Sequence, residues 1–165
     1  MGLFFSADWC APCKTMLKPL KNFYTDVNLE KKQFEVIYVP TDPDASGYQN
    51  HYSTMPWLSI PHGDARVASL MQKYDIKAIP ALIIIDSETG FKVTDRARKD
   101  LQCDVKEVFA SWKKQLELNR GRAVKRAAED AVAESEKLER EYNAKKKKDE
   151  EKKAAEGGQL NADVA

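Results

Sequence analysis

The sequence has few cysteines, no long apolar run and almost no net charge. Only 3 of its 165 residues are cysteines, an odd number that does not suggest the disulfide framework of a small secreted protein. The longest apolar run, Ala81–Ile85, is far too short to cross a membrane, and no signal-peptide pattern opens the chain. Lys and Arg number 27 against 26 Asp and Glu, so charge gives no reason to expect a nucleic-acid or membrane partner. We therefore expect a cytoplasmic location.

Aromatic and charged residues are distributed unevenly along the chain. Nearly all aromatic residues precede Ser111, whereas the last third is rich in Lys, Glu and Ala. This division predicts a globular domain over 1–116, a charged helical extension over 117–156 and a disordered tail over 157–165. The extension allows ion pairs between side chains four residues apart, but its apolar residues are too sparse for a firm coiled-coil seam. It is either a solvated, partly frayed helix or a helix that docks onto a larger assembly.

Strands and helices alternate in the predicted globular domain. Short apolar and β-branched runs predict strands, and apolar residues spaced three and four apart predict helices. The expected strands are 2–6, 34–39, 81–85 and 91–94, and the expected helices are 13–26, 45–53, 65–74 and 104–116. Residues 55–61 are bounded by prolines and are expected to form a loop. This order predicts an α/β fold in which crossovers join parallel strands.

The segment 9–14, Trp-Cys-Ala-Pro-Cys-Lys, places a Cys-x-x-Cys pair between a predicted strand and a predicted helix. The unpaired N–H groups and the dipole at a helix start favour an anion, which lowers the pKa of a thiol placed there. The Cys10 thiolate would therefore be both a nucleophile and a good leaving group. Cys13, one turn further on, can then attack the mixed disulfide and release the reduced substrate. Pro12 suits the first helical turn because it has no N–H.

A Cys-x-x-Cys pair can instead hold half of a zinc site. Such a site needs two further ligands, and the chain offers Cys103, His51 and His62, which are scattered singly. Redox chemistry is therefore the stronger interpretation. We expect no metal, and no cofactor besides a redox-active Cys10–Cys13 disulfide.

A second informative element, Ile79-Pro80, directly precedes the predicted central strand. Together with the segment around Cys10 it resembles the thioredoxin superfamily, whose Ile-Pro or Thr-Pro at this point carries a cis proline facing the active site. The resemblance implies a cis Ile79–Pro80 bond and a backbone at Ile79 that docks the substrate peptide by strand-like hydrogen bonds. Proline is also common at the start of a strand, so Pro80 alone is weak evidence for the resemblance. Its occurrence together with the cysteine motif makes the evidence strong.

Longer segments narrow the likeness to the tryparedoxin and nucleoredoxin branch of that superfamily. Residues 4–14 and the Met-Pro-Trp-Leu region of 52–61 are similar to this branch, and residues 74–80 continue the likeness. The resemblance extends from Gly2 to about residue 114. It implies a thioredoxin-like minimal fold, a mixed sheet of about four strands flanked by helices.

The same resemblance implies the residues that meet a substrate. It places Trp9 beside Cys10 and Trp57 near the redox pair, although Trp57 could equally be a packing residue of the core. The implied catalytic residues are Cys10 and Cys13, and the implied substrate-binding residues are Trp9, Ala11, Pro12, Trp57, Ile79 and Pro80.

The chain departs from the branch in three ways. Relatives begin with a segment that supplies an edge strand, whereas this chain starts inside the first central strand, so residues 34–39 are expected to form an unpaired edge. Ala11 replaces the branch's usual proline, which should tune the redox potential. The buried carboxylate of thioredoxins falls on Phe4, so proton transfer at Cys13 must use another group or water.

These observations predict a thiol–disulfide oxidoreductase that reduces protein disulfides through Cys10 and Cys13. By resemblance it would take electrons from a low-molecular-weight dithiol or a reductase and pass them to proteins such as peroxiredoxins. The alternative is a thioredoxin-like subunit with secondary redox activity. It would be anchored in a large cytoskeletal or ciliary complex through the C-terminal helix or the exposed edge strand.

Overall fold

The computed structural model describes residues 1–159, with the side chains of 1–148, 150 and 151. The chain divides into two compact units, Met1–Asn119 and Arg120–Ala165. Residues 160–165 of the predicted tail lie outside the described residues.

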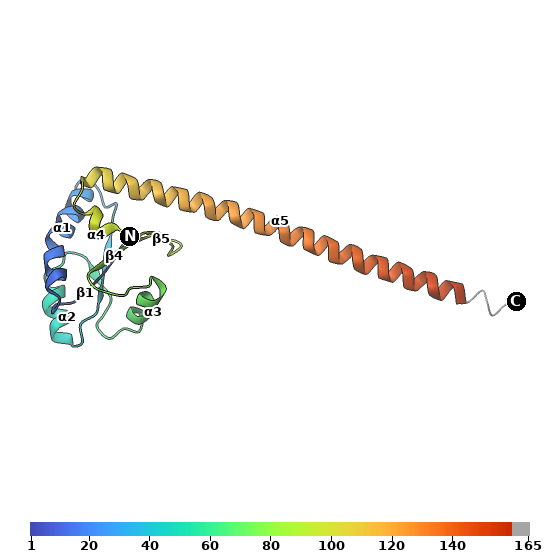
Figure 1. The fold of residues 1–165 in the computed structure, drawn as a ribbon, viewed down its shortest axis with the longest axis horizontal. Coiled ribbons are helices and arrows are strands. Elements are labelled where there is room, and N and C mark those ends of the chain that lie inside the picture. Colours follow the sequence, from blue (N-terminus) through green and yellow to red (C-terminus); the bar gives the residue numbers. More distant parts are fainter. Residues whose placement is uncertain (160–165) are drawn as a thin grey trace. The chain divides into compact units, whose positions relative to one another are not determined.

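A mixed sheet of five strands, in the order β3-β2-β1-β4-β5, forms the centre of the first unit (Figure 1). Strand β1 (Gly2–Ser6) pairs in parallel with β2 (Val36–Pro40) and antiparallel with β4 (Ala81–Ile85). Strand β2 also pairs in parallel with β3 (Leu58–Ser59), and β4 pairs antiparallel with β5 (Lys92–Thr94). The predicted α/β fold with a mixed sheet is confirmed, with one strand more than expected.

The prediction that residues 34–39 form an unpaired edge strand is wrong. Strand β2 is paired on both sides, and the 2-residue strand β3 forms that edge of the sheet. The prolines at 56 and 61 favour a loop, but they only limit the length of the strand between them. The chain between the prolines is extended, with Trp57 buried just before β3 and Leu58 exposed within it. The expected loop therefore contributes a short strand that covers β2.

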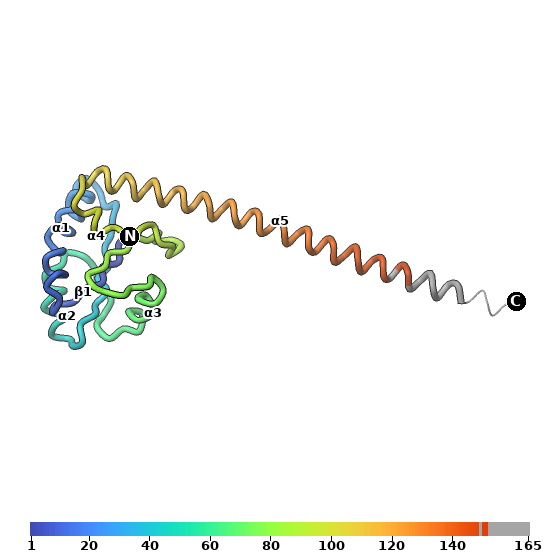
Figure 2. Tube along the Cα trace, in the orientation of Figure 1, coloured from blue at the N-terminus to red at the C-terminus, as the bar shows by residue number. Residues whose placement is uncertain are grey.

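Helices cover both faces of the sheet. Side chains of α1 (Ala11–Val27), α2 (Ala45–Tyr52), α4 (Ala97–Asp100) and the start of α5 (Val105–Gln159) pack together on one face. Side chains of α3 (Arg66–Lys73) pack on the other face. Figure 2 shows the trace of β1 lying between α1 and α3. Because β1 is covered on both sides, every one of its residues is buried.

The side chains of β1 alternate between these two layers, as a period of two requires. Phe4 packs into the layer of α1, whereas Leu3 and Phe5 pack into the layer of α3. Ser6 lies two residues after Phe4, so its side chain points to the same face of the sheet. There it bonds to His51 of α2. The polar end of β1 therefore lies in the same layer as the start of α1.

The second unit consists of helix α5 from Arg120 onward, and the helix continues to Gln159, beyond its predicted end at 156. Its large apolar side chains among the described residues, including Val124 and Tyr142, are exposed. Within the part of the chain that the structure describes, no helix has the length and apolar character to cross a membrane. The ion pairs along the unit include Lys125–Glu129, Glu136–Arg140 and Lys137–Glu141.

Candidate active site

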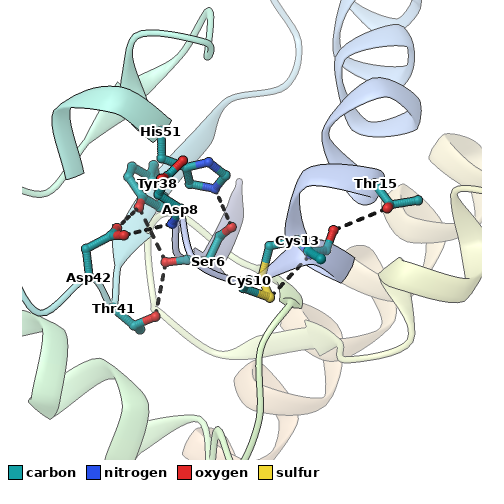
Figure 3. Close-up of a disulfide and its surroundings, with 10 residues drawn as sticks. Ser6, Asp8, Cys10, Cys13, Thr15, Tyr38, Thr41, Asp42 and His51 are labelled. Atoms are coloured by element: carbon teal, nitrogen blue, oxygen red, sulfur yellow. Dashed lines mark hydrogen bonds between the residues drawn. A yellow bond between two sulfur atoms is a disulfide. The ribbon is translucent and has the colours of Figure 1, made fainter. Parts of the chain in front are cut away.

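Cys10 and Cys13 form a disulfide at the junction between β1 and α1, with their Cα atoms 5.2 Å apart (Figure 3). Cys10 is the N-cap of α1 and Cys13 lies in its first turn. Cys10 is 4% exposed and Cys13 is fully buried. Of the two sulfur-bearing residues, Cys10 is therefore the one with surface that another molecule can reach.

The start of α1 directs its N–H groups at Cys10. The Cys13 N–H donates to Cys10 Sγ at 3.3 Å, and the Cys10 carbonyl accepts from the N–H groups of Cys13 and Lys14. Pro12 lies in this first turn, where its missing N–H costs no hydrogen bond, and the turn contains no acidic residue. This arrangement stabilises negative charge on the Cys10 sulfur once the disulfide is reduced.

The turn that carries Cys10 is held by contacts on both of its sides. The Cys10 N–H donates to the Ala7 carbonyl, and the Asp8 N–H donates to Asp42 Oδ1 at 2.7 Å. The Asp8 carboxylate forms an ion pair with Lys14 at 2.9 Å, across the disulfide-bearing turn. These contacts fix the turn to α1 and to the loop after β2, so the Cys10 sulfur has a defined position.

A buried polar network lies beneath this turn (Figure 3). Ser6 Oγ lies 2.7 Å from His51 Nε2, and the Ser6 carbonyl accepts from the Thr41 hydroxyl at 3.1 Å. The Tyr38 hydroxyl donates to Asp42 Oδ2 at 2.6 Å. Burial lowers the pKa of His51, while burial and the neighbouring Asp42 raise the pKa of Tyr38 far above its usual range. The imidazole is therefore neutral and the phenol protonated at neutral pH.

The sequence did not indicate this network. Ser6 and His51 are 45 residues apart, and no local pattern connects them. The one available signal is the placement of polar side chains at the ends of apolar strands, as Ser6 ends β1 and Asp42 follows β2. Such a pattern indicates that polar groups lie near the ends of the strands, but it does not predict which of them form hydrogen bonds with each other.

A pocket of about 570 Å³ opens beside Cys10. Its walls come from three segments: the cysteine turn, the residue after β2, and the region of α3 and the loop leading to β4. The pocket is lined by Trp9, Cys10, Ala11, Pro12, Thr41, Met71, Lys77, Ala78 and Ile79. The structure thus brings together four of the predicted substrate-binding residues, Trp9, Ala11, Pro12 and Ile79. Pro80 is buried beside Ile79, and the bond between them is cis, as the resemblance implied.

Trp57 does not line this pocket. It is 4% exposed and its ring meets Phe4 edge-on at 6.4 Å and Tyr24 at 5.5 Å between centroids. Its buried indole N–H has no hydrogen-bond partner among the residues that the structure describes. The position of Trp57 therefore supports a packing role, and a contact with substrate stays a prediction.

The side chains considered as zinc ligands lie apart. Cys103 is a free, exposed cysteine, His51 is bonded to Ser6, and His62 Nε2 lies 3.1 Å from the Asp42 carbonyl. Among the described side chains, no three residues of the metal-ligating types come together. Cys10 and Cys13 are bonded to each other rather than presented as a pair of thiolates.

Another pocket, of about 590 Å³, lies between the end of α1 and the start of α5. Charged side chains of both signs line it, among them Glu30 and Lys113, and its lining contains neither cysteine nor histidine. The pocket beside Cys10 is therefore the one in which the reactive sulfur and a binding surface coincide.

Comparison with known proteins agrees with this architecture. A family model described as thioredoxin-like matches residues 1–90, more than half of the chain. Nucleoredoxin of Danio rerio is 34% identical over 127 residues, which are 75% of this chain and 30% of that protein. This chain thus spans less than a third of that relative's length.

Solved structures of tryparedoxins have the same fold. Tryparedoxin from Trypanosoma brucei has a TM-score of 0.57 and 34% identity, covering 61% of this chain and 69% of that one. Tryparedoxin II, solved in complex with glutathionylspermidine, has a TM-score of 0.56 and 34% identity over the same shares of the two chains. The predicted likeness to tryparedoxins and nucleoredoxins is confirmed. With its mixed sheet and its disulfide at a helix start, the chain belongs to the thioredoxin-like family.

Proposed function

We propose that this chain is a thiol–disulfide oxidoreductase that reduces disulfide bonds in other proteins. The observation that carries the proposal is the position of Cys10 Sγ, which accepts the Cys13 N–H at the start of α1 and borders an open pocket. A helix start stabilises the thiolate, and the pocket gives a substrate access to it. Membership of a redox family supports the same assignment.

The reaction takes two exchanges. In the reduced protein the Cys10 thiolate attacks one sulfur of the substrate disulfide, forms a mixed disulfide and displaces the other sulfur as a thiolate. The Cys13 thiolate then attacks Cys10 Sγ and displaces the second substrate sulfur. Two electrons pass to the substrate, and the Cys10–Cys13 disulfide is formed. The full burial of Cys13 supports this order, because a substrate in the pocket meets Cys10 first.

The lining of the pocket supports a peptide as the substrate. Trp9 is 67% exposed at the rim, and with Pro12, Met71 and Ile79 it offers apolar surface to the residues that flank a substrate disulfide. The backbone at Ile79, just before β4, would pair with an extended substrate segment. Lys77 is the charged residue of the lining and would favour an acidic side chain near the disulfide.

The electron donor is proposed to be a low-molecular-weight dithiol or a reductase, and the substrates to include peroxiredoxins. The complex of a similar tryparedoxin II with glutathionylspermidine supports a small thiol compound as a ligand of this site. A dithiol donor requires a reducing compartment, so a cytoplasmic location is part of the proposal.

The alternative role, an anchored subunit of a cytoskeletal or ciliary complex, receives no support from the relatives. One of its premises, an unpaired edge at residues 34–39, is wrong because β2 pairs with β3. Its other premise, the exposed second unit, is equally expected of a solvated helix.

The test is catalysis of insulin reduction by dithiothreitol. We expect Cys10→Ser to lower the rate to that without protein. Reduced Cys13→Ser, freed of dithiothreitol and mixed with insulin, should leave a mixed disulfide that mass spectrometry detects. Cys103→Ser is the matched control, since Cys103 is a free and exposed cysteine, and it should retain the full rate. A Cys10→Ser protein that reduces insulin as fast as the unmodified chain would overturn the assignment.

A further inference from the structure

Cys13 must lose a proton before it can attack Cys10. The position at which thioredoxins carry a buried carboxylate is occupied by Phe4 in this chain, so no carboxylate there can accept the proton. Cys13 is fully buried, so bulk water does not contact its thiol directly. Phe4 is also fully buried and belongs to the apolar layer beneath α1. The proton of Cys13 therefore needs another acceptor.

Ser6 carries a buried hydroxyl on the face of the sheet that α1 covers. Ser6 lies two residues after Phe4 in β1, so its side chain points to the same face of the sheet, the one that α1 covers. Cys13 is a buried residue of the first turn of α1. The residue after Ser6, Ala7, packs against both Cys10 and Cys13. Figure 3 shows the Ser6 hydroxyl directed at the ring of His51.

His51 has the chemistry of an acceptor. Its pKa is lowered by burial, raised by the facing carboxylates of Asp42 and Asp8, and lowered by Lys14, with burial dominant. The ring is therefore neutral at physiological pH, and Nε2 can accept a hydrogen bond from the Ser6 hydroxyl at 2.7 Å. When the ring takes a proton, the same two carboxylates stabilise the imidazolium.

The other polar groups of this layer are already engaged. Asp42 accepts the Asp8 N–H with Oδ1 and the Tyr38 hydroxyl with Oδ2. Tyr38 therefore acts as a donor to a carboxylate. The Asp8 carboxylate is paired with Lys14 near the surface. Among the described groups beneath the cysteine turn, His51 is the one with a neutral basic nitrogen directed at Ser6.

We propose that Ser6 and His51 form a proton relay for the resolving step, an inference that rests on the proposed function. The Cys13 thiol passes its proton to Ser6 Oγ while the Ser6 hydroxyl passes its own to His51 Nε2. The Cys13 sulfur then bonds to Cys10 Sγ, the bond between Cys10 and the substrate breaks, and the substrate leaves as a thiolate with the electron pair. His51 finally returns the proton to solvent or to that thiolate. In this relay Ser6 exchanges a proton with the reacting Cys13 thiol, whereas His51 acts through Ser6 and is a positioning residue.

The reagent 5,5′-dithiobis(2-nitrobenzoate) separates the two exchanges. One equivalent added to the reduced protein releases a first thionitrobenzoate when Cys10 attacks and a second when Cys13 resolves the mixed disulfide. The measurement is made by stopped flow in a Cys103→Ser background, which removes the third thiol. The first phase reports on Cys10, and the second reports on the step that the relay serves.

We expect Ser6→Ala and His51→Gln to slow the second phase about 100-fold at neutral pH and to leave the first phase intact. The second phase of the unmodified chain should level off near neutral pH. In the two variants it should keep rising with pH, because only thiolate already present can react. Ser6→Thr, which restores a hydroxyl, should recover most of the rate. His62→Gln is the matched control for losing a histidine and should retain the second phase.

An unchanged second phase with an unchanged pH profile in His51→Gln and Ser6→Ala would overturn the relay. An equal loss of both phases in variants that keep a native circular dichroism spectrum would also overturn it, because it would mark a purely structural role. Absence of the first phase in the unmodified chain would instead contradict the proposed function itself.

Discussion

Ser6 Oγ lies 2.7 Å from His51 Nε2 in a layer where both residues are almost fully buried. Burial lowers the pKa of His51 below its usual 6.5, so the unfolded chain binds a proton more readily than the folded one. The stability contributed by the neutral ring is thus fully present above that value and is lost as the pH falls through the folded-state pKa. Urea unfolding between about pH 7.5 and 5 should show the free energy of unfolding falling more steeply for the unmodified chain than for His51→Gln.

The comparison with His62→Gln isolates this effect. His62 is half-buried and its Nε2 lies 3.1 Å from the Asp42 carbonyl, and its loss should leave the steeper slope in place. Parallel slopes for all three proteins would show that His51 titrates alike in the folded and unfolded states.

Cys10 and Cys103 should differ in reactivity in the order opposite to their exposure. Cys103 is exposed, whereas Cys10 is 4% exposed but sits at the start of α1. Since alkylation needs the thiolate, iodoacetamide at about pH 6.5 should modify Cys10 of the reduced chain roughly tenfold faster. Peptide mass spectrometry over time measures both sites at once. Faster labelling of Cys103 would mean that access, and not charge stabilisation, decides reactivity.

Replacing Trp9 should weaken the binding of a protein substrate. Its exposed ring stands at the rim of the pocket beside Cys10, where it can bury apolar surface on the substrate. We expect Trp9→Ala to raise the KM for insulin about fivefold, with a smaller effect on kcat. Phe91→Ala removes another exposed aromatic ring from the first unit, outside the pocket, and should leave the KM in place. Equal effects of the two substitutions would deny Trp9 a binding role.

Two buried tryptophans should respond differently to replacement by phenylalanine. The Trp112 indole N–H donates to Asp100 Oδ2 at 3.0 Å, whereas the Trp57 N–H has no partner among the described residues. Trp112→Phe loses a hydrogen bond to a carboxylate, while Trp57→Phe removes an unsatisfied donor. We expect Trp112→Phe to lower the free energy of unfolding by about 1–2 kcal/mol more than Trp57→Phe, as measured with urea. A larger loss at Trp57 would contradict this view of the core.

The parts of the site that are local in sequence were predictable. The cysteine pair lies within one helical turn, and a strand before it and an amphipathic pattern after it mark the junction where it acts. The resemblance of the residues around Ile79 located the opposite wall of the pocket and its cis bond. Each of these features rests on a few consecutive residues.

The remaining features depend on contacts distant in sequence. Strand β3 was missed because it has only 2 residues, too few to show the alternation of side chains that marks a strand in a sequence. It is defined by its pairing with β2, which is distant in sequence. The bond between Ser6 and His51 forms only when α2 packs over the end of β1. Trp57 was ambiguous because a large aromatic residue beside a proline suits both a core and a binding surface, and its burial against Phe4 became visible only in the folded structure.

The sulfur of Cys10 both caps helix α1 and performs the proposed chemistry. Serine is among the best N-cap residues, and its hydroxyl could accept the Cys13 N–H in place of the sulfur. A single exchange of sulfur for oxygen would therefore remove electron transfer while keeping the helix start. Loss of the redox chemistry would therefore leave the start of α1 and the pocket beside it intact.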